Sequence, residues 1–277
     1  MVRKGVIIQA RANSARLPCK IFFKLPFNSD VTVVEQVIAR SKKIANIDDI
    51  IIATTCKKND NALENITKLK GIKIFRGDDF NVLERFYYAA KINNIDVIIR
   101  ITGDSPCVDP LVVSGALENH IEKGPDYTVT KGYPMGVNVE VFNFDALEKV
   151  YKNAKEDYEK EHVTPYINRN PQKFKINIVK APKELYAPDI RISLDTEEDY
   201  ALLCAVFDYL YPKNKYFSAY DIVNLFKEKP WLKLINKKII QKKIFNTLEE
   251  ELKEALKILD LQDLNKARDF IREYLSR

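Results

Sequence analysis

Three cations lie within one short segment near the start of the chain: Arg11, Arg16 and Lys20. They follow an apolar run, Val6–Ala10, that has the composition of a buried strand. The segment contains no glycine, although loops that hold phosphate after a first strand usually do so through glycine-rich backbone. Guanidinium groups pair with phosphate oxygens in a bidentate manner, and an ammonium supplies a compact charge. The segment therefore predicts a loop that binds phosphate through side chains.

Acidic residues follow two later strand-like segments. Asp104 comes after Val97–Thr102, and Asp195 comes directly after Ile190–Leu194. If these runs are strands of one parallel sheet, their carboxyl ends lie at the edge where open α/β folds bind ligands. Mg²⁺ is held by triphosphate oxygens together with one or two carboxylates. The two acids and the cationic loop together indicate a site for a nucleoside triphosphate and a divalent ion, with Asp104 and Asp195 as metal ligands.

Each acid taken alone has a simpler interpretation. Asp104 stands in Gly-Asp-Ser-Pro, a composition typical of turns. Asp195 stands close to the start of a helix expected over 197–209, where it could serve as a cap. The chain contains neither Gly-x4-Gly-Lys-Ser/Thr nor Gly-x-Gly-x-x-Gly, which disfavours a P-loop ATPase and a dinucleotide-dependent dehydrogenase.

The elements that must position these residues alternate along the first 130 residues. Strand-like runs cover 6–10, 49–54, 71–75 and 97–102, and helix-like stretches cover 32–43, 60–70 and 81–93. This order predicts an α/β protein with a mostly parallel sheet flanked by helices. The run at 49–54 is β-branched and continuously apolar from Ile50 to Ala53, as a strand buried on both faces needs to be.

The rest of the chain divides into a mixed region and a helical tail. Residues 125–195 contain strand-like pieces at 127–130, 138–142, 174–179 and 190–194 and a helix-like stretch at 144–154. We interpret them as an insertion that belongs to a first domain, 1–235. Residues 236–277 form a helical extension, in which apolar residues recur at helical spacing from Leu248 to Leu275. That apolar stripe is expected to pack either on its own domain or on a second copy of the chain.

Composition limits the class of protein. The 277 residues are 46% apolar and carry a net charge of +6, which suits a sizeable core and a small anionic ligand. The sequence lacks an apolar run of membrane-spanning length, a signal-peptide pattern and a dense Lys/Arg run for nucleic acid. The four cysteines are widely spaced, and we expect them to be reduced. The expectation is a cytoplasmic protein with no membrane or nucleic-acid partner.

The candidate residues belong to seven ordered motifs between residues 6 and 230. They are Ala10-Arg11-x-x-Ser14-x-Arg16-Leu17-Pro18-x-Lys20, Ala53-Thr54-Thr55, Arg76-Gly77 with Val82-Leu83-Glu84-Arg85, Arg100-Ile-Thr102-Gly103-Asp104-Ser-Pro106, Gly136-Val-Asn138-Val-Glu140-Val-Phe142, Glu161-His162-Val-Thr-Pro-Tyr166-Ile and Asp195-Thr196-Glu-Glu-Asp199. Together they resemble the cytidylyltransferases that activate sugar acids, a family that includes 3-deoxy-manno-octulosonate and acylneuraminate cytidylyltransferases. The resemblance is closer to the branch named for spore coat polysaccharide biosynthesis protein F.

This resemblance implies a glycosyltransferase-A-like, Rossmann-related nucleotidyltransferase domain over 1–235, with the acceptor side in 125–195. It implies Mg²⁺-dependent transfer of a cytidylyl group from CTP to an acidic keto sugar, with release of pyrophosphate, for polysaccharide or glycan synthesis. The nucleotide would be bound by Ala10, Arg11, Ser14, Arg16, Lys20, Thr54, Thr55, Arg76, Gly77 and Thr102. The acceptor would face Tyr133, Gly136, Asn138, Glu140, Glu161 and His162. The three cations would also stabilise the leaving pyrophosphate, and a homodimer is expected from the family and the helical tail.

Two positions depart from the family pattern. Cys19 stands where relatives commonly have glycine, which is expected to stiffen the loop without changing its charge. Asn138 stands where many relatives have aspartate, which leaves the charge of the acceptor site open. His162 could contact substrate, act as a general base or simply begin a helix. His120 is interpreted as structural.

Other functions stay open at this stage. Transfer to a phosphate- or phosphonate-bearing acceptor would keep the fold and yield a diphosphate instead of an ester to one phosphate. Nothing on the base side identifies cytosine by chemistry alone, so another nucleotide is also compatible. A non-catalytic nucleotide-binding regulator is disfavoured, because the phosphate-binding cations and both metal-binding acids are present.

Overall fold

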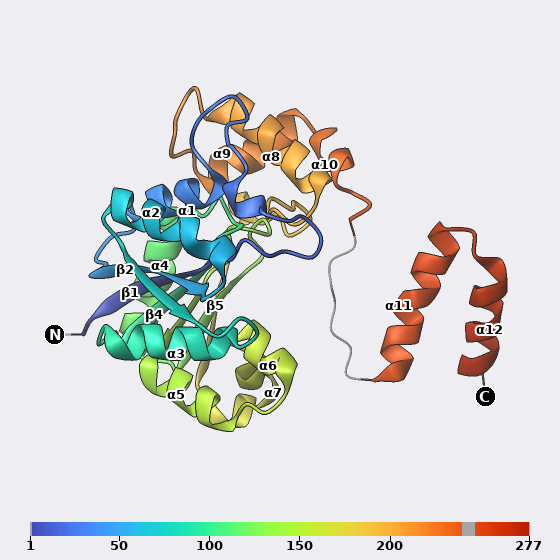
Figure 1. The fold of residues 1–277 in the computed structure, drawn as a ribbon. Coiled ribbons are helices and arrows are strands. Elements are labelled where there is room, and N and C mark those ends of the chain that lie inside the picture. Colours follow the sequence, from blue (N-terminus) through green and yellow to red (C-terminus); the bar gives the residue numbers. More distant parts are fainter. Residues whose placement is uncertain (1, 240–246, 277) are drawn as a thin grey trace. The chain divides into compact units, whose positions relative to one another are not determined.

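Seven strands form one sheet in the computed structural model, which describes residues 2–239 and 247–276 (Figure 1). The strands are β1 (Lys4–Gln9), β2 (Asp49–Thr55), β3 (Lys73–Gly77), β4 (Val97–Thr102), β5 (Tyr127–Lys131), β6 (Glu140–Asn143) and β7 (Ile176–Lys180). They lie in the order β3-β2-β1-β4-β6-β5-β7, and β6 is antiparallel to both of its neighbours. The predicted mostly parallel α/β sheet is confirmed.

The parallel strands bring their carboxyl ends to one edge. In the register of this sheet, Ile8 of β1 lies beside Ile52 of β2 and Ile101 of β4. These three side chains are buried, because helices cover both faces. The loops that leave β1, β2 and β4 therefore begin side by side, which is the geometry that the candidate site requires.

Helices cover the two faces of the sheet. On one face lie α1 (Val33–Ser41), α2 (Asn61–Lys70) and α4 (Pro110–Lys123), and on the other lie α3 (Val82–Ile92), α5 (Phe144–Asn153), α6 (Asp157–His162) and α7 (Pro165–Arg169). Figure 1 shows α3 and α5–α7 opposite α1 and α2. Polar side chains fix where helices begin: Thr32 and Glu35 form a reciprocal capping box at α1, and Asn81 caps α3.

A third group of helices packs beyond the carboxyl edge. It contains α8 (Glu197–Leu210), α9 (Ala219–Glu228) and α10 (Leu232–Ile235), which share a core with the loop segments around Val137 and Ile192. Short 3₁₀ turns are η1 (Lys20–Phe22), η2 (Lys58–Asp60), η3 (Pro171–Lys173) and η4 (Lys183–Leu185).

The predicted strand at Ile190–Leu194 is wrong. Only Arg191 of this segment forms a bridge, to Met135, and no ladder follows it. Ile190, Ile192 and Leu194 are buried in the core that α8 and α9 cover. The alternating apolar pattern therefore reflects a segment wedged beneath helices, which does not require a hydrogen-bonded strand partner.

The chain divides into two compact units, residues 1–237 and 238–277. The second unit contains α11 (Leu248–Leu261) and α12 (Asn265–Leu275), as the periodicity of the tail predicts. None of the described residues of these two helices is buried. Residues 240–246 and 277 of the predicted extension lie outside the described residues. Within 2–239 and 247–276, no helix has the length and apolarity needed to cross a membrane.

Candidate functional site

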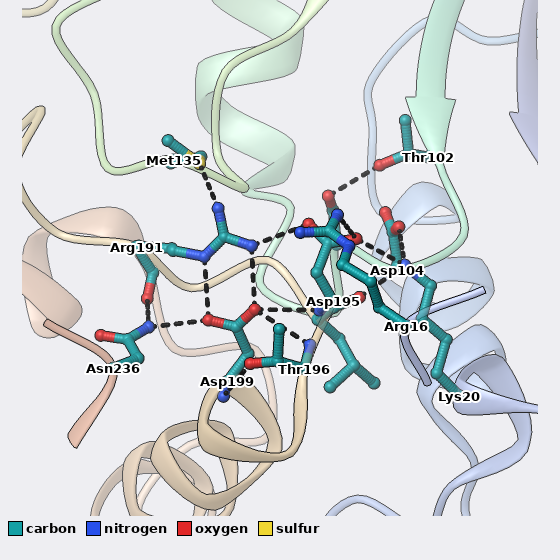
Figure 2. Close-up of polar contacts among 12 residues, drawn as sticks. Arg16, Lys20, Thr102, Asp104, Met135, Arg191, Asp195, Thr196, Asp199 and Asn236 are labelled. Atoms are coloured by element: carbon teal, nitrogen blue, oxygen red, sulfur yellow. Dashed lines mark hydrogen bonds and ion pairs between the residues drawn. The ribbon is translucent and has the colours of Figure 1, made fainter. Parts of the chain in front are cut away.

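Lys20 joins two acids that are far apart in sequence. Its Nζ lies 2.5 Å from Oδ2 of Asp104 and 2.9 Å from Oδ1 of Asp195 (Figure 2). The same Nζ donates to the carbonyl of Leu194 at 2.6 Å. An ammonium has three donors, so all three are used here. The loop after β1, the end of β4 and the start of α8 thus meet at one point, around what we call the carboxylate pair, Asp104 and Asp195.

Two arginines complete the surroundings of Asp195. Arg16 Nη2 lies 2.9 Å from Oδ1, and Arg191 Nη2 lies 2.8 Å from Oδ2. Burial alone would raise the pKa of Asp195, but Lys20 and the two arginines hold that pKa below its ordinary value. Burial would also lower the pKa of Lys20, and the carboxylate pair holds it above its ordinary value. Lys20 and Asp195 are therefore both charged at neutral pH.

The carboxylate pair fits a hard divalent cation. Among the described residues, no group of three or more His, Cys, Asp or Glu side chains could hold a metal ion. A metal at this site would thus take two carboxylates from the chain and its remaining ligands from water or phosphate oxygens. Mg²⁺ is commonly bound in this way beside a nucleotide. In this structure the buried Lys20 ammonium supplies the positive charge between the two acids.

Gly103 determines how closely β4 passes β1 just before Asp104. A Cβ at this position would lie 2.8 Å from the Cβ of Ala10 and 3.1 Å from the carbonyl oxygen of Gln9. Its amide donates to that same carbonyl at 2.8 Å. Thr102, at the end of β4, shares a 2.9 Å hydrogen bond with the hydroxyl of Ser105. These contacts fix the turn that carries the first carboxylate.

A buried aspartate shapes the cationic loop. Asp60 accepts the amide of Ala12 at 2.6 Å and the hydroxyl of Thr55. The carbonyl of Ala12 in turn accepts the amide of Cys19 at 2.9 Å, which closes the loop. Cys19 has a positive φ of 58°, a conformation that suits glycine better than a residue with a Cβ. Ser14 is half-buried within the closed loop.

Arg11 pairs with a different set of residues from Arg16 and Lys20. Its Nη1 donates to the carbonyl of Asp79 at 3.1 Å, and its Nη2 lies 4.0 Å from Oε1 of Glu161. Arg11 thus connects the cationic loop to the segment after β3 and to the end of α6. Arg16 and Lys20 thus share a partner, Asp195, whereas Arg11 contacts Asp79 and Glu161.

Several residues predicted to bind the nucleotide lie packed among other protein groups. Arg76 donates to the carbonyls of Thr55 and Lys57 and to Asn61, and it pairs with Glu64. Thr54 is fully buried, and its hydroxyl has no partner among the described residues. A Cβ on Gly77 would lie 2.9 Å from the ring of Phe75. These residues lie at the carboxyl ends of β2 and β3.

The residues predicted to face the acceptor fall into two groups. Tyr133, Gly136 and Asn138 lie in the loop between β5 and β6, where Asn138 donates to the carbonyl of Tyr133 at 3.3 Å. Gly136 has φ of 105°, and a Cβ there would lie 2.9 Å from the carbonyl carbon of Ile192. Glycine is thus required where this loop crosses the segment that leads to Asp195.

Glu140 lies within a polar network at the start of β6. Its carboxylate pairs with Arg100 and accepts hydrogen bonds from the hydroxyls of Tyr127 and Thr164, the latter at 2.7 Å. Burial would raise the pKa of Glu140, but Arg100 and the two hydroxyls hold it below its ordinary value. Glu140 therefore connects the turn between α6 and α7, through Thr164, to strands β4 and β5, through Arg100 and Tyr127.

Glu161 and His162 end helix α6 and are exposed. The ring of His162 lies against that of Tyr158, with 5.1 Å between centroids. The next residue, Val163, has φ of 69°, and the amide of Thr164 donates to the carbonyl of His162 at 2.8 Å. This tight turn is strained for a β-branched residue. It is anchored because Val163 is buried and Thr164 bonds to Glu140. His120, predicted to be structural, is buried and bonds to Thr128 and Asn143.

Sequence reasoning did not identify Arg191 and Asp60 as site residues. Asp60 gave a weak signal, since it follows β2 by a few residues. Arg191 gave a spacing signal, because it precedes Asp195 and Asp199 by four and eight residues. Both act on other protein groups, a role that residue type alone does not reveal.

The comparisons with known proteins agree with this geometry. A sequence profile described as cytidylyltransferase matches residues 5–220. An uncharacterized protein of Methanocaldococcus jannaschii is 40% identical over 241 residues, which are 85% of this chain and 95% of that protein. Spore coat polysaccharide biosynthesis protein SpsF of Bacillus subtilis is 36% identical over 203 residues, 73% of this chain and 85% of that protein. The structure of a cytidylyltransferase from Leptospira borgpetersenii has a TM-score of 0.78 and 30% identity, covering 87% of this chain and 100% of that chain.

A mostly parallel sheet with acids and cations at its carboxyl edge, together with these matches, defines a nucleotidyltransferase. The chain belongs to the cytidylyltransferase family. The resemblance inferred from the seven motifs is confirmed. The structure of CMP:2-keto-3-deoxy-manno-octonic acid synthetase complexed with CTP has a TM-score of 0.59 at 13% identity, which establishes a common fold.

Proposed function

We propose that this chain transfers the cytidylyl group of CTP to an acidic keto sugar, with Mg²⁺ as cofactor and pyrophosphate as the leaving group. The observation that carries the proposal is the carboxylate pair, Asp104 and Asp195, joined by Lys20 at the carboxyl edge of the sheet. The similarity to SpsF, whose name refers to polysaccharide biosynthesis, supports a sugar acceptor.

Asp104 and Asp195 would hold the metal ion, which neutralises phosphate charge when it is bound. Once the carboxylates are shared with a cation, the Lys20 ammonium is free to exchange a carboxylate for a phosphate oxygen. Arg16 is one-third exposed, so its guanidinium is accessible to a phosphate group that approaches Asp195. Lys20 and Arg16 would then stabilise the negative charge that grows on the departing pyrophosphate.

The remaining predicted residues take the nucleoside and the acceptor. We assign Ala10, Ser14, Thr54, Thr55, Arg76, Gly77 and Thr102, together with Arg11, to the nucleotide side. We assign Tyr133, Gly136 and Asn138, together with Glu161 and His162, to the acceptor side. Glu140 supports the acceptor side from within, because its carboxylate anchors Thr164 next to the turn that follows His162.

The test is a panel of pyrophosphate-release assays with Mg²⁺. CTP, UTP, GTP and ATP are each combined with acidic keto sugars, sugar phosphates and phosphonates, and the expected result is release with CTP and a keto sugar acid. Asp104→Asn and Asp195→Asn are each expected to lower kcat/KM by at least about 10²-fold. Asp189→Asn is the matched control, since Asp189 is an exposed carboxylate paired with Lys233.

Other outcomes each contradict a part of the proposal. Release with a sugar phosphate or phosphonate, with a diphosphate product, would replace the keto sugar acid as acceptor. Nucleotide binding without release for any pair would favour a regulator. Wild-type rates in both Asn variants would show that the carboxylate pair does not hold the metal.

A further inference from the structure

Arg191 bridges two carboxylates behind the candidate metal site. Its Nε and Nη2 donate to the two oxygens of Asp199, each at 2.9 Å, and Nη2 also donates to Oδ2 of Asp195 at 2.8 Å (Figure 2). The remaining Nη1 lies 3.4 Å from the sulfur of Met135. The Arg191 side chain is only 10% exposed. One largely buried guanidinium thus joins the carboxylates of Asp195 and Asp199.

The two oxygens of Asp195 face different partners. Oδ1 receives Lys20 and Arg16, and it is the oxygen on the side of Asp104. Oδ2 receives Arg191. A carboxylate held at one oxygen cannot turn about its Cβ–Cγ bond without breaking that contact, so Arg191 helps to fix the orientation of the carboxylate plane, with the other oxygen toward Asp104.

Asp199 is the fixed point to which Arg191 is attached. Its side chain is fully buried and accepts the backbone amides of Asp195 and Thr196 at 3.0 and 3.2 Å. Thr196 caps α8 in return by accepting the amide of Asp199. The helix start, the backbone of Asp195 and the guanidinium are thus joined through one carboxylate, which leaves the loop before α8 little freedom to move.

A further contact comes from Asn236, which lies more than 35 residues after Asp199 in the chain. Its Nδ2 donates to Oδ1 of Asp199 at 2.9 Å and to the carbonyl of Arg191 at 3.0 Å. Asn236 is buried. It therefore holds both Asp199 and the Arg191 backbone from the side opposite Asp195.

We propose that Arg191 is a positioning residue for metal binding: it holds Oδ2 of Asp195 so that Oδ1 is presented toward Asp104. Asp199 and Asn236 fix the guanidinium in that orientation. The inference rests on the proposed function, in which Asp195 is a metal ligand. A lysine at this position would keep the charge, but a single ammonium cannot reproduce the planar fork that engages both carboxylates.

The first test is Arg191→Lys, measured by the Mg²⁺ dependence of pyrophosphate release. Groups that orient metal ligands typically change metal affinity or activity by 10- to 100-fold. We expect about a 10-fold rise in the Mg²⁺ concentration for half-maximal rate and a fall in kcat, with the acceptor KM unchanged. The matched control is Arg3→Lys, because Arg3 also donates through Nε and Nη2 to a carboxylate, that of Asp49, before the amino end of β1.

A second variant and a second measurement keep the inference testable if Arg191→Lys does not fold. Asn236→Ala keeps the Arg191 side chain and removes a hydrogen bond to its backbone and one to Asp199, so the Mg²⁺ requirement should rise by less than the about 10-fold expected for Arg191→Lys. Calorimetric titration of each protein with CTP at a limiting Mg²⁺ concentration gives a readout that does not need turnover, and it should show weaker binding in the same order.

The outcomes separate this inference from the proposed function. A wild-type Mg²⁺ requirement in both Arg191→Lys and Asn236→Ala, in protein that melts cooperatively, would overturn the inference and leave the function intact. Wild-type protein that releases no pyrophosphate would refute the proposed function. In that case the role of Arg191 would be tested by the calorimetric comparison of the variants, which does not depend on turnover.

Discussion

Replacing Lys20 by methionine should inactivate the protein and at the same time increase its stabilisation by Mg²⁺. The ammonium lies between the two members of the carboxylate pair, at 2.5 and 2.9 Å. Methionine fills a similar volume but leaves the two acids without the cation between them. A divalent ion added without nucleotide then supplies the missing charge, whereas in the wild type it must compete with Lys20.

The magnitude follows from the contacts. Each hydrogen bond between charged groups contributes about 1.5–3 kcal/mol, and Lys20 makes one with each acid. Both acids keep about a quarter of their side-chain surface exposed, so water offsets part of the loss. We estimate a net destabilisation of about 3 kcal/mol, which corresponds to a fall in Tm of about 6–12 °C for a unit of this size. Mg²⁺ at ten times its Kd restores about 1.4 kcal/mol.

Thermal denaturation of the wild type and of Lys20→Met, each with and without Mg²⁺, measures both effects. Lys24→Met is the control, because Lys24 lies four residues further along the chain and its side chain makes an exposed ion pair with Asp30. An equal Mg²⁺-induced shift in the wild type and in Lys20→Met would refute the reasoning, since it would mean that the ammonium and the metal do not share the carboxylate pair. A Tm for Lys20→Met equal to that of the wild type would contradict the estimated stability.

Three further predictions concern stability. The pKa of Asp195 is held below its ordinary value, so the ionised carboxylate contributes to the free energy of unfolding. This contribution is complete above about pH 4 and is lost as pH falls through the lowered pKa. The free energy of unfolding, measured with urea, should therefore decrease less on acidification in Asp195→Asn than in the wild type. Gly136→Ala should lower the free energy of unfolding by about 2–4 kcal/mol, because φ is 105° and the new Cβ would lie 2.9 Å from the Ile192 carbonyl. Gly115→Ala, on a helix with open space around the new Cβ, should raise it by about 0.5–1 kcal/mol. Equal free energies of unfolding in urea for the two variants would contradict this prediction. Cys19→Gly should change the free energy of unfolding by no more than about 1 kcal/mol. Glycine adopts the positive φ of this position without strain, and this gain offsets the larger entropy of the unfolded chain. A larger loss in chemical denaturation would show that the Cys19 side chain contributes contacts of its own.

The sheet and its helices could be predicted because their composition is dictated by burial. Strands β1, β2 and β4 lie between two helix layers, so continuous apolar runs are required there. The segment Ile190–Leu194 alternates apolar and polar residues instead, and α8 and α9 bury its apolar side chains although it forms only a single bridge, to Met135. Local composition therefore indicates that a segment is buried, but it does not indicate whether strands or helices cover it.

The sequence by itself determined the mostly parallel α/β fold, the helical tail and the motifs that define the cytidylyltransferase family. The tertiary structure decided which charges meet. It brings Lys20 to Asp104 and Asp195, which are 84 and 175 residues away, and it sends Arg11 to Asp79 instead. The physical reason is that these contacts depend on strand order and on how the loops pack at the carboxyl edge. Those features arise from the whole core, and no segment of the chain encodes them locally.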